Sequence, residues 1–170
     1  RVVLCAIDWC GLCGPAHRLF RDKIAEAAAT DVSHVTVHTV HQHTAPYIPM
    51  GTLEPRDKTG GPSENLEPSV IHQLAQRLGD AVKKSLEQFQ PFNAIGTGQA
   101  QVDRVASARR ILTDDGKILT RWSACKDPDL RAKPEGRIDP MLKTVTLARD
   151  GKPLVRIHYY ATHPQSFYGD

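Results

Sequence analysis

The stretch Val35-Thr36-Val37-His38-Thr39-Val40-His41-Gln42-His43-Thr44-Ala45-Pro46 is a β-branched run that ends in a His-x-His pair just before a proline. Its alternating valines predict a strand from about His34 to Val40. Side chains two apart along a strand point to the same face, so we expect His41 and His43 to project side by side from its end. Two imidazoles that converge at the end of a core strand suit a metal site.

A second apolar run, Val2-Val3-Leu4-Cys5-Ala6-Ile7-Asp8, precedes this strand in the chain. Its continuous apolar character is typical of a strand covered on both faces. A glycine-rich turn ending at Pro15 follows, and residues 16–29 carry an amphipathic face, which predicts a helix. A strand–helix–strand unit of this size favours a parallel pair joined by a helical crossover.

The chain after the His pair begins with a long segment rich in proline, glycine and charge, residues 44–68. Loops of this length in compact domains are usually functional or disordered, so we interpret it as a lid or substrate-binding loop. An apolar stripe of helical spacing then predicts a long helix from Pro68 to about Phe89.

From residue 94 onward the sequence pattern is typical of β-strands. Residues 94–105 predict a strand with bulges at Gly96 and Gly98. Two Asp-Gly turns predict hairpins, over residues 111–120 and 142–160, on either side of a second long polar loop at 123–140. We therefore predict one α/β domain over residues 1–170, with a mixed, partly parallel sheet, flanking helices and C-terminal β-hairpins.

The composition excludes some classes of partner. The net charge of +3 arises from 22 basic and 19 acidic residues, and the basic residues form no dense block that would indicate nucleic-acid binding. No apolar run approaches the ~18–20 residues that span a bilayer, so we expect no transmembrane segment. The chain starts inside an expected core strand and stops soon after His163, which predicts a fragment of a longer protein.

The four cysteines are Cys5, Cys10, Cys13 and Cys125. Cys10-x-x-Cys13 has the spacing of a redox or zinc-knuckle pair, but the sequence holds no second Cys pair. We favour small, buried structural residues around a strand-to-helix turn. A disulfide or a metal role is the alternative.

A third histidine, His163, closes the strand-like run Tyr159-Tyr160-Ala161-Thr162-His163 before Pro164. Catalytic zinc commonly takes three protein ligands plus water, so His41, His43 and His163 form a candidate metal set. The alternative is a group of imidazoles that hydrogen-bond to backbone or water. We prefer that alternative for four further histidines, because strand alternation or helix exposure places them elsewhere: His34, His38, His72 and His158.

The chain resembles the neutral/alkaline (non-lysosomal) ceramidases. The run His41-Gln42-His43-Thr44-Ala45-Pro46 is similar to their T-H-T-H-S-G-P motif, and Tyr160-Ala161-Thr162-His163-Pro164 to their F-A-x-H-P motif. The first strand and turn, residues 2–12, and the Ala94-Ile95-Gly96-Thr97-Gly98 run also match in order. The resemblance covers nearly the whole chain, as the N-terminal part of that family's catalytic domain.

The resemblance implies a zinc-dependent hydrolase that cleaves an N-acyl amide bond of a lipid-like or related small substrate with metal-activated water. His41 and His163 would bind Zn²⁺, His43 would handle the proton beside it, and Arg109, or its neighbour Arg110, would contact the substrate carbonyl. The family's remaining ligands, a Glu and a Tyr, would lie beyond residue 170. The resemblance also suggests a secreted or periplasmic protein.

Departures from the family motifs fall where the substrate would sit. Thr44-Ala45 replaces Ser-Gly, and Ala108 replaces the Asn before the arginine. Two other functions stay open: a ligand- or carbohydrate-binding module that keeps the ceramidase-like fold, and a phosphate-binding turn at residues 11–14. Arg104, Arg109, Arg110 and Arg121 could also bind an anionic group.

Overall fold

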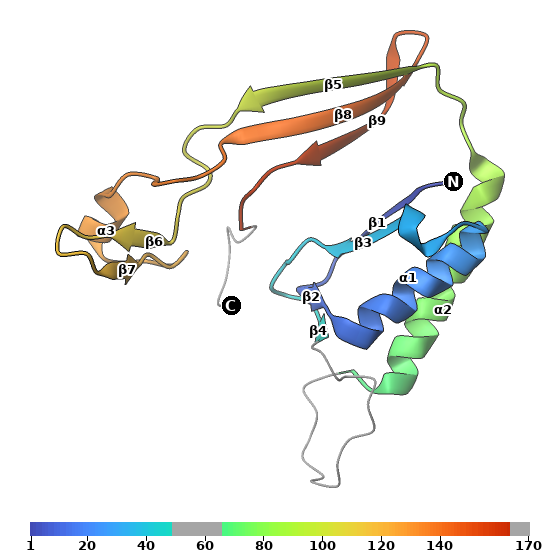
Figure 1. Ribbon diagram of the computed structural model, residues 1–170, viewed down its shortest axis with the longest axis horizontal. Coiled ribbons are helices and arrows are strands. Elements are labelled where there is room, and N and C mark those ends of the chain that lie inside the picture. Colours follow the sequence, from blue (N-terminus) through green and yellow to red (C-terminus); the bar gives the residue numbers. More distant parts are fainter. Residues whose placement is uncertain (49–65, 164–170) are drawn as a thin grey trace, which may run out of the picture. The chain divides into compact units, whose positions relative to one another are not determined.

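The first part of the chain forms the strand–helix–strand arrangement expected from the sequence (Figure 1). Strand β1 (Val3–Ile7) pairs in parallel with β3 (Val35–Thr39), with Val3 opposite Val35 and Ile7 opposite Thr39. Helix α1 (Gly14–Ala28) makes the crossover, with a proline in its first turn and a left-handed residue at its C-terminal cap. The predicted parallel pair with a helical crossover is confirmed.

The computed structural model describes residues 1–48 and 66–163. Most of the predicted lid, residues 49–65, lies outside these described residues. Contacts group the chain into two compact units, Arg1–Phe89 and Gln90–Asp170. A single domain over residues 1–170 stays a prediction.

One further α-helix, two 3-10 turns and one pair of two-residue strands complete the described part of the first unit. Helix α2 (Pro68–Ser85) continues into a 3-10 turn, η2 (Leu86–Gln88), and runs beside α1 (Figure 1). A second 3-10 turn, η1 (Val32–His34), precedes β3. Strand β2 (Gly11–Leu12) pairs in parallel with β4 (Tyr47–Ile48), which joins the chain after β1 to the chain after β3.

The helices pack on the strands through a continuous apolar core. Ile24 of α1, Ile48 of β4 and Ile71 of α2 are the largest fully buried side chains, and Phe20 is nearly so. The two helices approach closely at Gly79, where a Cβ atom would lie 3.3 Å from the Lys23 carbonyl oxygen. Burial of these side chains is the main stabilising contribution to the unit.

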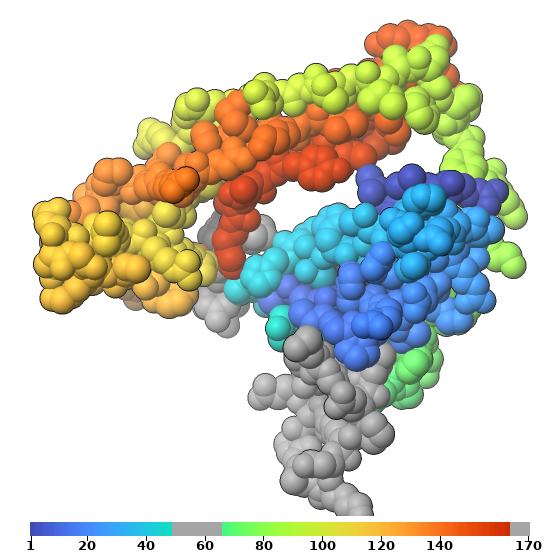
Figure 2. Space-filling view, viewed as in Figure 1, coloured from blue at the N-terminus to red at the C-terminus, as the bar shows by residue number. Residues whose placement is uncertain are grey.

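The second unit contains a three-stranded antiparallel sheet in the order β5-β8-β9. Its strands are β5 (Ala94–Gln101), β8 (Met141–Arg149) and β9 (Lys152–Tyr159), which Figure 2 shows as adjoining yellow-green, orange and red bands. The hairpin β8–β9 turns at Asp150 and Gly151, whose φ angles of 51° and 77° match a type I′ turn.

The bulges predicted at Gly96 and Gly98 are wrong. Strand β5 pairs with β8 in unbroken register from Ala94 to Gln101. A Cβ atom added at either glycine would meet no other atom within 4 Å, so no close approach requires glycine there. The irregularity of this sheet lies instead between Leu147 and Ala148, where β8 pairs with β9.

The other predicted hairpin is also present, as β6 (Arg110–Leu112) and β7 (Ile118–Thr120). The polar loop predicted at 123–140 is interrupted by a short helix, α3 (Pro128–Ala132). Asp127 explains this helix, because its carboxylate accepts hydrogen bonds from the backbone amides of Asp129 and Leu130. The loop prediction overlooked this Asp-Pro cap.

The α/β class is confirmed, with parallel strands in the first unit and antiparallel hairpins toward the C-terminus. Within residues 1–48 and 66–163, the parallel and antiparallel pairs belong to separate sheets. Of the helices in these residues, none is long and apolar enough to cross a bilayer.

The core makes a direct prediction about stability. Replacing Ile71, which is fully buried, by alanine should lower the free energy of unfolding by about 2–5 kcal/mol, because it removes buried methyl groups and leaves a cavity. Val70 on the same helix is 37% exposed, so Val70→Ala is the matched control and should cost far less. Chemical denaturation of the full chain measures both. Equal losses in the two variants would contradict the assigned core.

Candidate metal centre

The parallel pairing of β1 and β3 brings two loops to one edge of the sheet, because both strands end there. Backbone hydrogen bonds hold the loops together beyond the strands: His41 N–H donates to the Trp9 carbonyl at 3.0 Å, and Cys10 N–H to the Pro46 carbonyl at 3.0 Å. Cys13 N–H donates to the Ile48 carbonyl at 2.9 Å. These amides serve the loop pairing, which argues against a phosphate-binding role for the turn.

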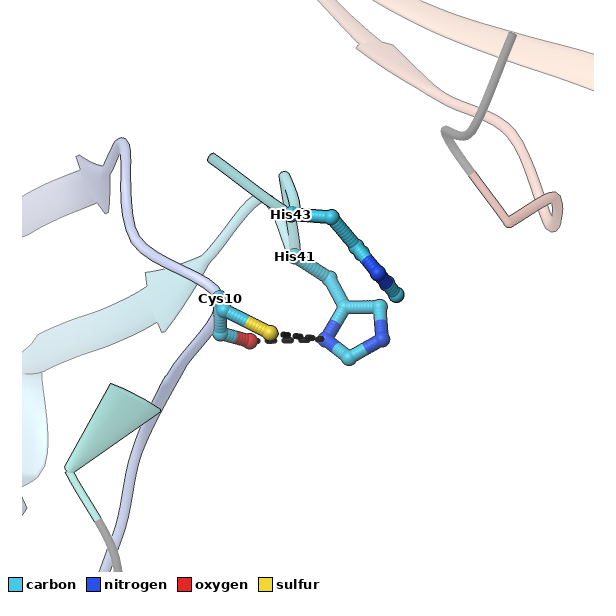
Figure 3. A group of neighbouring side chains, drawn as sticks. All are labelled: Cys10, His41 and His43. Atoms are coloured by element: carbon cyan, nitrogen blue, oxygen red, sulfur yellow. Dashed lines mark hydrogen bonds between the residues drawn. The ribbon is translucent and has the colours of Figure 1, made fainter. Parts of the chain in front are cut away.

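Cys10, His41 and His43 form a group that could hold a metal ion (Figure 3). One ligand atom from each residue lies within 4.8 Å of the others. The two imidazole rings are 4.9 Å apart between centroids and meet edge to face at 87°. Both histidines are exposed and Cys10 is partly buried, so solvent ions can reach the group.

The two histidines lie side by side as predicted, but strand alternation is not the reason. Strand β3 ends at Thr39, and His41 adopts a left-handed backbone with φ of 58°. Gln42 shapes the turn, because its side-chain amide nitrogen donates to the Asp8 carbonyl at 3.3 Å and its side-chain oxygen accepts from Thr44 N–H at 2.6 Å. The loop therefore brings the two rings together after the strand has ended.

The hydrogen bond at His41 fixes which ring nitrogen can bind a metal. Its Nδ1 lies 2.7 Å from the Cys10 carbonyl oxygen, and a carbonyl only accepts, so Nδ1 carries the proton. In the neutral ring the lone pair then resides on Nε2. Histidines that bind metals commonly donate their other ring N–H to a carbonyl in this way. His41 is thus held in the tautomer of a ligand.

The donor set fits a borderline-soft divalent metal. Zinc is bound by thiolate sulfur and imidazole nitrogen, and catalytic zinc sites combine three protein ligands with an open position. Ligand atoms around one tetrahedral zinc ion lie roughly 3–4 Å apart, so small rotations of these side chains would suffice. The Cys10 Sγ lies 3.7 Å from His41 Nδ1, the protonated nitrogen, so binding through Nε2 would require the thiol or the ring to rotate.

Sequence reasoning missed Cys10 as a member of this group and favoured a structural role for it. The missed signal is topological: Cys10 follows β1 by three residues and His41 follows β3 by two, and parallel partners end at one edge. All four cysteines are free thiols. Cys5 fits the structural interpretation better, because burial raises the pKa of its thiol.

The other predicted site residues lie in the second unit. Arg109 and His163 both line a pocket of about 440 Å³. Arg109 donates a hydrogen bond to Ser123 Oγ at 2.9 Å, and its guanidinium lies 5.5 Å from the centre of the Trp122 ring. Arg110, the neighbouring candidate, is exposed at the start of β6. The pairing of His41 with His163 around one ion stays a prediction.

Two of the histidines interpreted as structural have ordinary partners. His158 Nδ1 shares a hydrogen bond with Thr144 Oγ1 at 2.8 Å, and His34 Nδ1 shares one with Thr30 Oγ1 at 3.3 Å. His38 and His72 are exposed, on β3 and α2 respectively. Within the described ranges 1–48 and 66–163, none of these four belongs to a three-residue group with metal-ligand spacing.

Comparison with known proteins identifies no relative. No family model, no curated protein and no solved structure matches the chain.

The group makes a spectroscopic prediction. Co²⁺ titrated into the reduced full chain should bind and produce a sulfur-to-cobalt charge-transfer band, because Cys10 supplies a thiolate ligand. The band should disappear in Cys10→Ser. Cys13→Ser is the matched control, because Cys13 is equally half-buried in the same turn but outside the group, and its spectrum should match that of the parent chain. A band that survives Cys10→Ser would exclude Cys10 as a ligand.

Proposed function

We propose that this chain is part of a zinc-dependent hydrolase that cleaves the N-acyl amide bond of a lipid-like or related small substrate. The observation that carries the proposal is the convergence of the Cys10, His41 and His43 ligand atoms within 4.8 Å of one another. The reaction class comes from the resemblance of the two histidine motifs, around His41 and His163, to those of neutral ceramidases. The substrate is a small molecule or lipid.

The proposed roles divide among the residues by their chemistry. His41 would bind the ion through Nε2, with its ring oriented by the Cys10 carbonyl, and the Cys10 thiolate would be a further ligand. When bound, zinc would lower the pKa of a water molecule far below that of bulk water, so that hydroxide would form near neutral pH. His43 takes a proton from the nucleophile and returns it to the leaving amine. Its ring beside that of His41 supports this role.

Arg109 is proposed to stabilise the negative charge that develops on the carbonyl oxygen during attack. Its hydrogen bond to Ser123 and its contact with Trp122 support the role, because both restrain the guanidinium before substrate arrives. His163 is proposed as a second histidine ligand, on the resemblance of its motif. It lines the same pocket as Arg109, which supports a shared task for the two residues.

The competing function is a ligand- or carbohydrate-binding module that keeps a ceramidase-like fold without its chemistry. Metal content separates the two functions. A folded chain that holds stoichiometric zinc favours the hydrolase, whereas a folded chain without affinity for zinc favours the binding module.

Zinc binding and turnover should depend on His41. His41→Asn is the sharpest variant, because asparagine tolerates the left-handed backbone at this position and removes the imidazole. We expect zinc content, measured by elemental analysis, to fall to background, together with hydrolysis of a fluorogenic N-acyl amide. His72→Asn, on the exposed face of α2, is the control and should retain both. Full zinc content in His41→Asn would refute the assigned ligand.

Turnover should depend on Arg109 without loss of zinc. Arg109→Ala should lower kcat for the amide substrate by ~10²–10³, the usual effect of removing one donor to a developing oxyanion. Arg110→Ala removes the same charge from the next residue, which is exposed, and should change kcat little. If the parent chain hydrolyses the amide and Arg109→Ala does so at nearly the same rate, Arg109 does not stabilise the oxyanion.

A further inference from the structure

The second unit contains a strongly basic pocket, and all of its described lining residues belong to that unit. It has a volume of about 440 Å³ and is formed by the segment before β6, the segment after β7, the residues around α3 and the chain after β9. Five of its lining side chains are cationic and one is a carboxylate: Arg104, Arg109, Arg121, Arg131, Lys133 and Glu135. We call this site the basic pocket. Its volume is in the range of small-molecule sites.

Arg121 is the most informative residue of the basic pocket, because it is 91% buried, with 9% of its surface exposed. Its two terminal nitrogens donate four hydrogen bonds to backbone carbonyls, those of Ala108, Leu130, Lys133 and Pro134. The guanidinium has five N–H donors, and the fifth, on Nε, has no partner among the described residues.

Arg121 also belongs to none of the ion pairs between described residues, although the Glu135 carboxylate lines the same pocket. Its hydrogen-bond partners in these residues are backbone carbonyls. A buried charge without a counter-charge is costly, and a donor without an acceptor adds to that cost. An anion in the basic pocket would relieve both.

Other side chains of the basic pocket are suited to the same ligand. Arg109 is restrained by Ser123 and Trp122, so little side-chain entropy remains to be lost when it binds. The planar guanidinium matches the two oxygens of a carboxylate or phosphate. Ser107 and Thr162 also line the pocket and offer hydroxyl donors.

We propose that the basic pocket binds the anionic group, carboxylate or phosphate, of a small-molecule ligand. If the proposed hydrolase function holds, its substrate is then an acidic N-acyl compound rather than a neutral one. That second statement depends on the proposed function, whereas anion binding by the second unit does not.

The test uses two pairs of ligands, each an acidic compound and its neutral analogue. N-acetylglycine is compared with its neutral analogue N-acetylglycinamide, and N-acetyl-O-phosphoethanolamine with N-acetylethanolamine. Each is titrated into the full chain by calorimetry, with a chelator present so that binding is measured without metal or turnover. The acidic member of at least one pair should bind about tenfold or more tightly than its neutral analogue, and the tighter acid identifies the preferred group.

Matched variants locate the site. Arg131→Gln removes an exposed charge that lines the basic pocket and should weaken binding of the acidic ligand several-fold. Arg137→Gln removes the same charge from the following loop, outside the pocket lining, and should leave affinity unchanged. These positions are preferred to Arg121, because its four backbone hydrogen bonds make that residue necessary for folding.

Three outcomes would overturn the proposal: no binding of either acid, equal affinity for acid and neutral analogue, or equal weakening by Arg131→Gln and Arg137→Gln. The proposed hydrolase fails separately, through absent zinc or absent turnover. If a chain without zinc binds the acid, anion binding by the basic pocket is supported and only the proposed hydrolase function is contradicted.

Discussion

The parallel pairing of β1 and β3 is the constraint on which the first unit depends. It aligns two strands whose partners are 32 residues apart in sequence, Val3 and Val35, and so ends both strands at one edge. Hydrogen bonds from Val40 to Ile7 and from His41 to Trp9 extend the pairing past the strands. Without this extension, Cys10 and His41 would lie on separate loops with no fixed distance between them. The chemistry proposed for the first unit is thus a consequence of strand register.

In the second unit one buried side chain, that of Arg121, has a comparable structural importance. Arg121 follows β7 and donates to one carbonyl within α3, to two carbonyls that follow α3 and to one before β6. Its guanidinium therefore connects the short helix α3 to the loop segments around it. The same group lines the basic pocket, so the residue that orders these loops also contributes one of the pocket's positive charges. If the proposed anion binds there, this cation serves both folding and ligand recognition.

The sequence was sufficient to predict most of the elements. Alternating valines, a proline at a helix start and Asp-Gly turns each have a local physical cause, and they predicted β3, α1 and both hairpins correctly. The predicted bulges failed because a glycine in a strand permits a bulge without requiring one. Cys10 was missed because its membership depends on a partner strand rather than on its neighbours in sequence. Arg121 was proposed only as one arginine among several, since burial and backbone partners are properties of the folded chain.

The left-handed backbone of His41 places the stability of the loop and metal binding in conflict at one position. For a residue with a Cβ atom this conformation costs about 1 kcal/mol relative to glycine. The substitutions that would most readily stabilise the loop, glycine or asparagine, are also those that delete the imidazole. Variants selected only for thermal stability would therefore drift away from metal binding at this position. In evolutionary terms, position 41 lies on a trade-off between the stability of the fold and the activity it could support.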